Sequence, residues 1–209
     1  MADGFMTYAL TGQVKFCKDY PPTASKPYGS LGFVVQTEPE VYTYIGSDNQ
    51  EYRQVINNNG LFIWANYKPE QVKDANFNKL KVRLTKGMNV FVRGDIKPKT
   101  NRETGESELS LDCHWRTIKV SADPLPILNK VTAAGEVVQW DPAILQVRYS
   151  YMNPLKKEWL DRSWAFVLPG YHTPEERQAP RTPIYVEGRV FGITDTGVKR
   201  VWVAADTVI

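Results

Sequence analysis

The sequence places aromatic and basic residues side by side at several points. These pairs are Tyr52 with Arg53, Tyr67 with Lys68, Trp115 with Arg116, and Arg148 with Tyr149. Flat rings stack on exposed nucleobases while Lys and Arg contact phosphates, and this combination binds single strands of nucleic acid. A single aromatic residue on a strand more often packs in a core. The prediction of binding chemistry therefore depends on the whole set of 6 Trp, 11 Tyr and 8 Phe.

Residues 61–67 form a predicted strand that sorts its aromatic residues between two faces. Successive side chains of a strand point to opposite sides. The more apolar set is predicted to face the interior, and it consists of Leu61, Ile63, Ala65 and Tyr67. Phe62 and Trp64 belong to the other set, so we predict that they face outward and stack on bases. Tyr67 is a third candidate because it lies at the end of the strand.

Basic residues gather at the tip of a predicted hairpin. Lys97, Lys99 and Arg102 fall within the segment 97–106, where they are predicted to contact phosphates. Arg53, next to an aromatic residue, is a further candidate. The alternative for the hairpin tip is a solvated loop that contacts no ligand.

The second half of the sequence offers candidates of the same kind. Alternation along a predicted strand at 144–151 points Arg148 outward. Tyr149 and Tyr151 share the opposite face, and the pattern assigns them either to the core or to a binding groove. Lys156 and Lys157 follow in a loop and are candidates for phosphate contact.

Catalytic and metal-binding chemistry has little support in the sequence. The cysteines, Cys17 and Cys113, lack the spacing of metal ligands. Cys113 precedes His114 directly, so on a strand the two side chains would point to opposite faces. The phosphate-binding glycine loop, the Gly-x-Ser-x-Gly motif and the His-Glu-x-x-His motif are all missing from the sequence. We therefore expect no catalytic residues, no metal and no cofactor, and an enzyme is the least expected class.

The composition is that of a folded protein with balanced charge. The 209 residues are 42% hydrophobic, and 26 basic against 23 acidic residues give a net charge of +3. This balance excludes a histone-like polycation but allows a local basic groove. The first residues lack the pattern of a secretion signal, and no apolar stretch is long enough to span a membrane. We expect a protein of the reducing cytoplasm that acts at the nucleoid or at replication sites, or in the host cytoplasm if the protein is viral.

A strand phrase occurs twice. Asn89–Ile96 reappears as Pro183–Val190, each ending in Val, a charged residue, Gly, a charged residue and an apolar residue. A second, weaker repeat matches Leu10–Val14 to Ala133–Val137. A repeated opening strand and a repeated late strand predict one small β-domain used twice.

These patterns predict an all-β fold of two tandem five-stranded OB-fold barrels. The first domain is predicted at 1–122, with a first strand at 5–16 and a short helix near Pro69. The second is predicted at 127–209, after a proline-rich linker. Barrels of this type commonly bind single-stranded nucleic acid.

Within the first half, an ordered series of segments resembles bacterial- and phage-type single-stranded DNA-binding proteins, and the chain as a whole is expected to be a divergent, tandem two-barrel version of that family, such as a phage or plasmid form. The aromatic strand Leu61–Lys68 leads into a helical segment, and Leu84–Ile96 contains a Lys-Gly-x-x-Val-x-Val-x-Gly strand followed by a basic loop. The second half resembles the family more weakly, through Trp164–Leu168 and Ile184–Val190. The resemblance implies an OB-fold and sequence-nonspecific binding of single-stranded DNA in replication, recombination or repair.

The sequence also departs from that family. The family usually has one barrel in each chain, and the third strand here lacks the family's Trp-His-Arg opening. The acidic C-terminal tail that recruits other proteins is not found at Val208–Ile209. Replication proteins therefore stay an open class of partner, but not through such a tail. Since the family commonly assembles four barrels, a homodimer is the expected assembly. Two other functions stay open: an OB-fold adaptor or oligomerisation module in a nucleoprotein complex, and a single-stranded RNA binder.

Overall fold

A computed structural model describes most of the chain. The described residues are 4–24, 26–45, 48, 50–56, 60–100, 105, 107–141, 144–153, 158–168, 177–195 and 198–209. Among them, no helix combines the length and apolar character needed to cross a bilayer.

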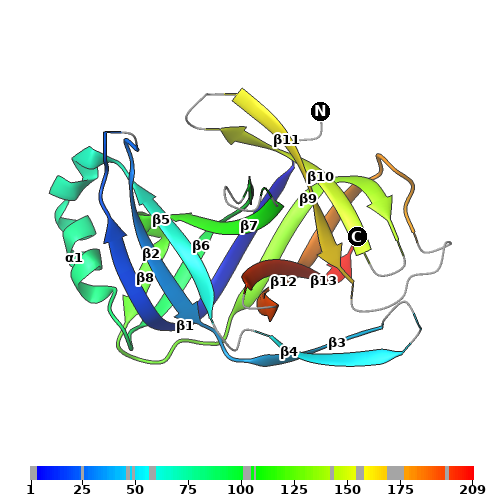
Figure 1. Ribbon diagram of the computed structural model, residues 1–209, viewed down its shortest axis with the longest axis horizontal. Helices are drawn as coiled ribbons and strands as arrows, with labels where there is room; N and C mark the ends of the chain where they lie inside the picture. The colour runs from blue at the N-terminus through cyan, green and yellow to red at the C-terminus, as the bar shows by residue number, and fades with distance from the viewer. Residues whose placement is uncertain are drawn as a thin grey trace.

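Strands dominate the first half (Figure 1). Its elements are β1 (Phe5–Tyr20), β2 (Gly29–Gln36), β3 (Glu40–Ile45), β4 (Glu51–Ile56), β5 (Leu61–Tyr67), the 3-10 helix η1 (Pro69–Lys73), α1 (Ala75–Arg83), β6 (Asn89–Thr100), β7 (Ser107–His114), the 3-10 turn η2 (Trp115–Thr117) and β8 (Ile118–Ser121). The expected helix after β5 is thus a 3-10 turn followed by α1, whose N-terminus is capped by the Asp74 side chain.

Five strands of this half close into a barrel. The pairings run from β1 to β2, β5, β7 and β6 and return to β1, with only the β5–β7 pair parallel. The glycine of the repeated phrase is required by this closure: a Cβ on Gly94 would lie 2.0 Å from the carbonyl oxygen of Asp112 on β7. The strand backbones therefore approach one another too closely for any other residue.

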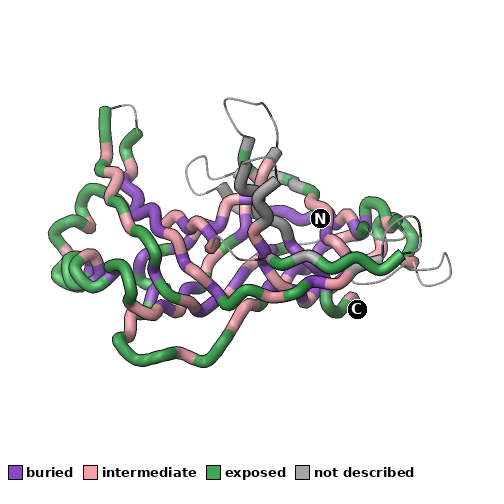
Figure 2. Tube along the Cα trace, turned by 60° about the horizontal axis from the view of Figure 1, so that its bottom comes forward, coloured by how far each residue is buried: buried purple, intermediate pink, exposed green. Residues whose placement is uncertain are grey.

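The barrel core follows from alternation along the strands, and buried and less buried residues alternate along the trace in Figure 2. Fully buried side chains include Tyr8, Phe33 and Ile63. At one end of the barrel, Phe77 of α1 packs its ring against Tyr67, with the ring centroids 4.7 Å apart. The helix therefore closes that end of the core.

The second half contains β9 (Asn129–Trp140), β10 (Ile144–Asn153), β11 (Glu158–Val167), β12 (Pro183–Asp195) and β13 (Val198–Val208). Their pairings follow the same cyclic order, from β9 to β10, β11, β13 and β12 and back to β9. Here too the glycine of the repeated phrase is tightly enclosed, since a Cβ on Gly188 would lie 1.8 Å from the carbonyl oxygen of Ala204.

The two halves share one sheet. Phe5–Leu10 of β1 pairs antiparallel with Asn129–Ala134 of β9, which joins the strands into an eleven-stranded sheet. At this junction the hydroxyl groups of Thr7 and Thr132 lie 3.1 Å apart. The Thr11 hydroxyl also donates to the Pro126 carbonyl, at 2.7 Å, and so holds the connecting segment.

The hairpin β3–β4 leaves the first barrel and lies along β12 and β13 of the second half (Figure 1). Tyr42 is 4% exposed and stacks on Phe191 of β12, with 5.2 Å between ring centroids. Arg189 of β12 donates hydrogen bonds to both Glu40 and Asp206. The hairpin thus packs on the second half through an aromatic stack and a charged network.

Candidate nucleic-acid interface

The outer face of the first barrel carries an aromatic cluster. Cα pairing places Gly32 of β2 between Lys18 of β1 and Trp64 of β5. Paired residues on neighbouring strands point to the same side of a sheet. On β5 the prediction of facing is confirmed, because Phe62 and Trp64 are partly exposed and the alternate residues are buried.

Three rings form what we call the aromatic platform: Tyr20, Phe62 and Trp64. The ring centroid of Trp64 lies 5.4 Å from that of Tyr20 and 4.8 Å from that of Phe62. Gly32 lies beneath them, where a Cβ would come within 2.8 Å of the Phe62 ring and 2.9 Å of the Tyr20 ring. The missing side chain lets the rings settle onto the sheet as one apolar surface.

Two lysines accompany the platform. The Lys18 ammonium lies 5.2 Å from the centroid of the Tyr20 ring, and the Lys26 ammonium lies 5.8 Å from the centroid of the Trp64 ring. Both distances suit cation–π attraction. Within the described part of the chain, no carboxylate pairs with either lysine, so both charges are available to an anionic ligand. Tyr20, Lys18 and Lys26 were not among the residues predicted to bind.

The predicted phosphate contacts on β6 lie on the same face but beside carboxylates. Lys97 is 3.8 Å from a carboxylate oxygen of Asp95 and 3.7 Å from one of Asp112. Lys99 is 3.6 Å from Glu108. These carboxylates offset the positive charge of the hairpin base. Arg102 lies outside the described residues.

Tyr67 faces the interior and cannot serve as a stacking surface in this structure. It is 3% exposed, and its hydroxyl donates to Asp19 at 2.7 Å. Burial and this hydrogen bond raise the pKa of the Tyr67 phenol well above its usual value. The expectation that a strand-end residue reaches the groove fails because Phe77 of α1 covers that end of the barrel.

The candidates outside the first barrel do not gather into one site. Arg148 points outward as predicted and pairs with Glu136, whereas Tyr149 is 4% exposed and belongs to the core. Arg53, on the hairpin, pairs with Glu51 at 3.0 Å. The side chain of Tyr151 is not described, and Lys156 and Lys157 lie outside the described residues.

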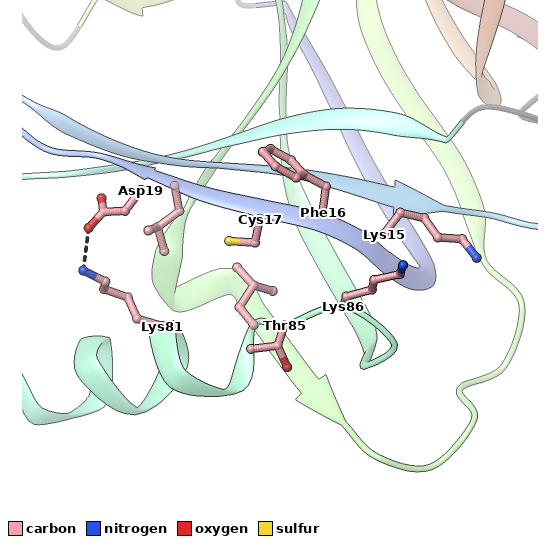
Figure 3. Close-up of a pocket in the computed structure, with 9 residues that line it drawn as sticks. Lys15, Phe16, Cys17, Asp19, Lys81, Thr85 and Lys86 are labelled. Carbon is pink, nitrogen blue, oxygen red and sulfur yellow. Dashed lines mark hydrogen bonds and ion pairs between the residues drawn. The ribbon is translucent and has the colours of Figure 1, made fainter.

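A separate cleft of about 430 Å³ lies between β1 and the end of α1 (Figure 3). Lys15 and Lys86 line it, and Lys81 is paired with Asp19 at 2.5 Å. Cys17 also lines the cleft, and burial raises the pKa of its thiol, which disfavours the reactive thiolate.

The cysteine and histidine residues of the described chain do not gather into a metal site. The described residues include no group of three or more His, Cys, Asp and Glu residues placed to hold a metal ion. Burial raises the pKa of the Cys113 thiol to about 12. Burial and the nearby Arg116 lower the pKa of His114.

Comparison with known proteins shows the fold. No protein-family model matches the chain, and no curated protein matches it. Among solved structures, the chain is similar to a deletion mutant of the single-stranded DNA binding protein from Thermus aquaticus. The two share 16% identity with a TM-score of 0.58, over 100% of this chain and 95% of that one. The closed barrel of β1, β2, β5, β7 and β6 thus belongs to a fold like that of a bacterial single-stranded DNA-binding protein.

Proposed function

We propose that this protein binds single-stranded DNA without strong sequence preference, through the outer face of the first barrel. The observation that carries the proposal is the aromatic platform with Lys18 and Lys26 beside it, neither of them paired with a carboxylate among the described residues. The likeness of the whole chain to a single-stranded DNA-binding protein supports the same conclusion. Such binding would serve DNA replication, recombination or repair.

The proposed mechanism combines stacking with charge. Bases that leave a duplex expose flat faces, and stacking on aromatic side chains contributes about 1–3 kcal/mol per base. Trp64 and Phe62 supply the largest surfaces, while Lys18 and Lys26 contact the phosphates. Every base has a flat face, so this mode of binding accepts many sequences.

We further propose that the chain is a tandem pair of OB-fold barrels, with domains at 1–122 and 127–209. Strand register supports this proposal. Tyr8 of β1 lies opposite Gly94 of β6, and Val131 of β9 lies opposite Gly188 of β12. Tyr8 and Val131 are themselves partners across the junction. The repeated phrase therefore occupies the same place in both cycles of strands.

Titration with an oligodeoxythymidine, followed by tryptophan fluorescence at low and high salt, tests the proposed function. Binding should quench the fluorescence, and the logarithm of affinity should fall with the logarithm of salt concentration by about 0.7 for each phosphate contacted. Absence of binding at low salt would contradict the proposal. Competition by an RNA strand of matched sequence would separate a DNA binder from an RNA binder.

A further inference from the structure

A carboxylate lies directly beside the aromatic platform. Asp112 of β7 is the Cα partner of Trp64 on β5 and of Asp95 on β6. Its neighbours along β7, Leu111 and Cys113, are buried, so its side chain points to the outer face. That side chain is 20% exposed, which leaves it accessible from the platform.

Asp112 keeps part of its capacity to accept hydrogen bonds. Ser110 donates to Oδ1 at 2.7 Å. The Lys97 ammonium is 3.7 Å from Oδ2, which is longer than a hydrogen bond. An ionised carboxylate has about four acceptor positions. Asp112 can therefore accept hydrogen bonds from a ligand that lies on Trp64.

Charge divides the binding face into two sides. Lys18 of β1 lies over the Tyr20 ring, Lys26 from the segment between β1 and β2 lies over the Trp64 ring, and both attract phosphates. Asp112 lies on β7, on the side of Trp64 away from β1, where the carboxylates of Asp95, Asp112 and Glu108 outnumber Lys97 and Lys99. This side attracts hydrogen-bond donors more than it attracts phosphates. A strand that places its phosphates near Lys18 and Lys26 would thus turn the edges of its bases toward Asp112.

Bases differ in what that edge offers. Cytosine carries the N4 amino donor and adenine the N6 amino donor, whereas thymine carries the O4 acceptor at the corresponding place. A carboxylate facing an amino group forms a hydrogen bond, but a carboxylate facing O4 leaves two desolvated acceptors without a donor.

We propose that Asp112 is a specificity-determining residue that favours bases with an exocyclic amino group, so that cytosine binds more tightly than thymine. This inference depends on the proposed binding of single-stranded DNA. Stacking on the platform accepts any base, and Asp112 adds a preference for bases with an exocyclic amino group.

The test compares oligodeoxycytidine with oligodeoxythymidine of equal length at neutral pH, for the natural protein and for Asp112→Asn. The natural protein should bind the cytidine strand about tenfold more tightly, equivalent to about 1.4 kcal/mol. In Asp112→Asn the ratio of the two dissociation constants should approach one, because an amide offers both a donor and an acceptor. The ratio is the readout, since removing the charge near Lys97 also changes the affinity for every strand.

Glu108→Gln is the matched control. It removes a carboxylate from the same face of β7. That carboxylate pairs with Lys99 at 3.6 Å and lies nearer the start of β7 than Asp112, which is the residue opposite Trp64. Its ratio should equal that of the natural protein. Asp112→Glu, which keeps a carboxylate, should retain the preference for cytidine.

The outcomes separate this inference from the proposed function. If the natural protein binds both strands equally, the inference is wrong while the proposed function stands, and no variant is needed to reach that result. A preference for cytidine that persists in Asp112→Asn would also overturn it. If neither strand binds, the proposed function fails and this inference fails with it.

Discussion

The outer faces of the two cycles of strands differ in composition and in what covers them. In the first barrel the face carries the aromatic platform and is open to solvent. In the second half the positions that match the platform are apolar, Arg189 beside them pairs with Glu40 and Asp206, and the β3–β4 hairpin packs on this face. The same arrangement of strands thus presents two surfaces with different uses.

Strand register identifies the corresponding residues. Asp112 pairs with the residue that follows Gly94, and Ala204 pairs with the residue that follows Gly188. Asp112 and Ala204 therefore correspond. Asp112 pairs with Trp64 in the parallel pair β5–β7, and Ala204 pairs with Val167 in the parallel pair β11–β13, so Trp64 and Val167 correspond as well. The corresponding pairs are Trp64 and Val167, Phe62 and Ala165, Asp112 and Ala204, and Lys97 and Phe191.

The residues at these positions explain why the β3–β4 hairpin packs on the second face and not on the first. The second face replaces two large rings and two charges with Val167, Ala165, Ala204 and Phe191. Ala204 is fully buried and Phe191 is 2% exposed, because Tyr42 of the hairpin packs on both. The small Ala204 beside Phe191 leaves room for Tyr42 to pack, whereas projecting rings and lysines suit a ligand. We therefore expect the first barrel to supply most of the binding.

Tyr42→Ala should have the largest effect, and it should be on stability. Truncating a buried aromatic residue costs about 3 kcal/mol, and Tyr42 provides the stack that holds the hairpin to Phe191. We expect a lower free energy of unfolding in urea and an unchanged affinity for oligodeoxythymidine. Tyr52→Ala is the control, since this ring of the same hairpin is 42% exposed.

Tyr42→Ala could instead raise the affinity and lengthen the segment of DNA that each chain occupies. That outcome would contradict the contrast drawn between a binding first face and a packed second face. The hairpin would then be a removable cover on a second binding face. Equal affinities and equal occluded lengths would instead sharpen the assignment of this face to internal packing.

Trp64→Ala should have the next largest effect, and it should be on binding. The loss of one stacking ring should weaken binding of oligodeoxythymidine by about 1–3 kcal/mol, measured by titration at fixed salt. Because Trp64 is only partly buried on the outer face, the free energy of unfolding should change less than in Tyr42→Ala. Unchanged affinity in a folded Trp64→Ala protein would remove the platform from the binding face.

Alternation along β5 was enough to predict the outward facing of Phe62 and Trp64, because a strand with one buried face has a period of two. The same rule placed Tyr149 on the inner set, although it could not decide between core and groove. Tyr67 was harder, since its burial depends on Phe77 of α1, and the sequence pattern does not show where that helix packs.

The platform was only partly predictable because the first strand was expected to end at Phe16. β1 in fact continues to Tyr20, with a shift of register between Val14 and Phe16, and this extension brings Lys18 and Tyr20 onto the same face as Trp64. Lys97 lies beside two carboxylates: Asp95 is on the same strand, but Asp112 comes from β7 and approaches Lys97 across strands. Such pairs depend on the register between distant segments, which local patterns do not fix.

The smallest expected effect separates two pairs of lysines on the binding face. Lys18 and Lys26 lie over aromatic rings without a carboxylate partner among the described residues, whereas Lys97 and Lys99 lie within 4 Å of carboxylates. Replacing Lys18 and Lys26 together by Ala should reduce the magnitude of the log–log salt slope by about 1.4, that is, by two phosphate contacts at about 0.7 each.

Replacing Lys97 and Lys99 together by Ala removes the same formal charge and so provides the matched comparison. We expect the salt slope to change less, because a phosphate that approaches these lysines also approaches Asp112 and Glu108, whose charges oppose it. Measuring oligodeoxythymidine affinity at several salt concentrations for both double variants gives the two slopes directly. A larger change for Lys97 and Lys99 would show that phosphates follow β6 rather than β1. Phosphates, and not base edges, would then lie beside Asp112, and the preference assigned to Asp112 would lose its basis.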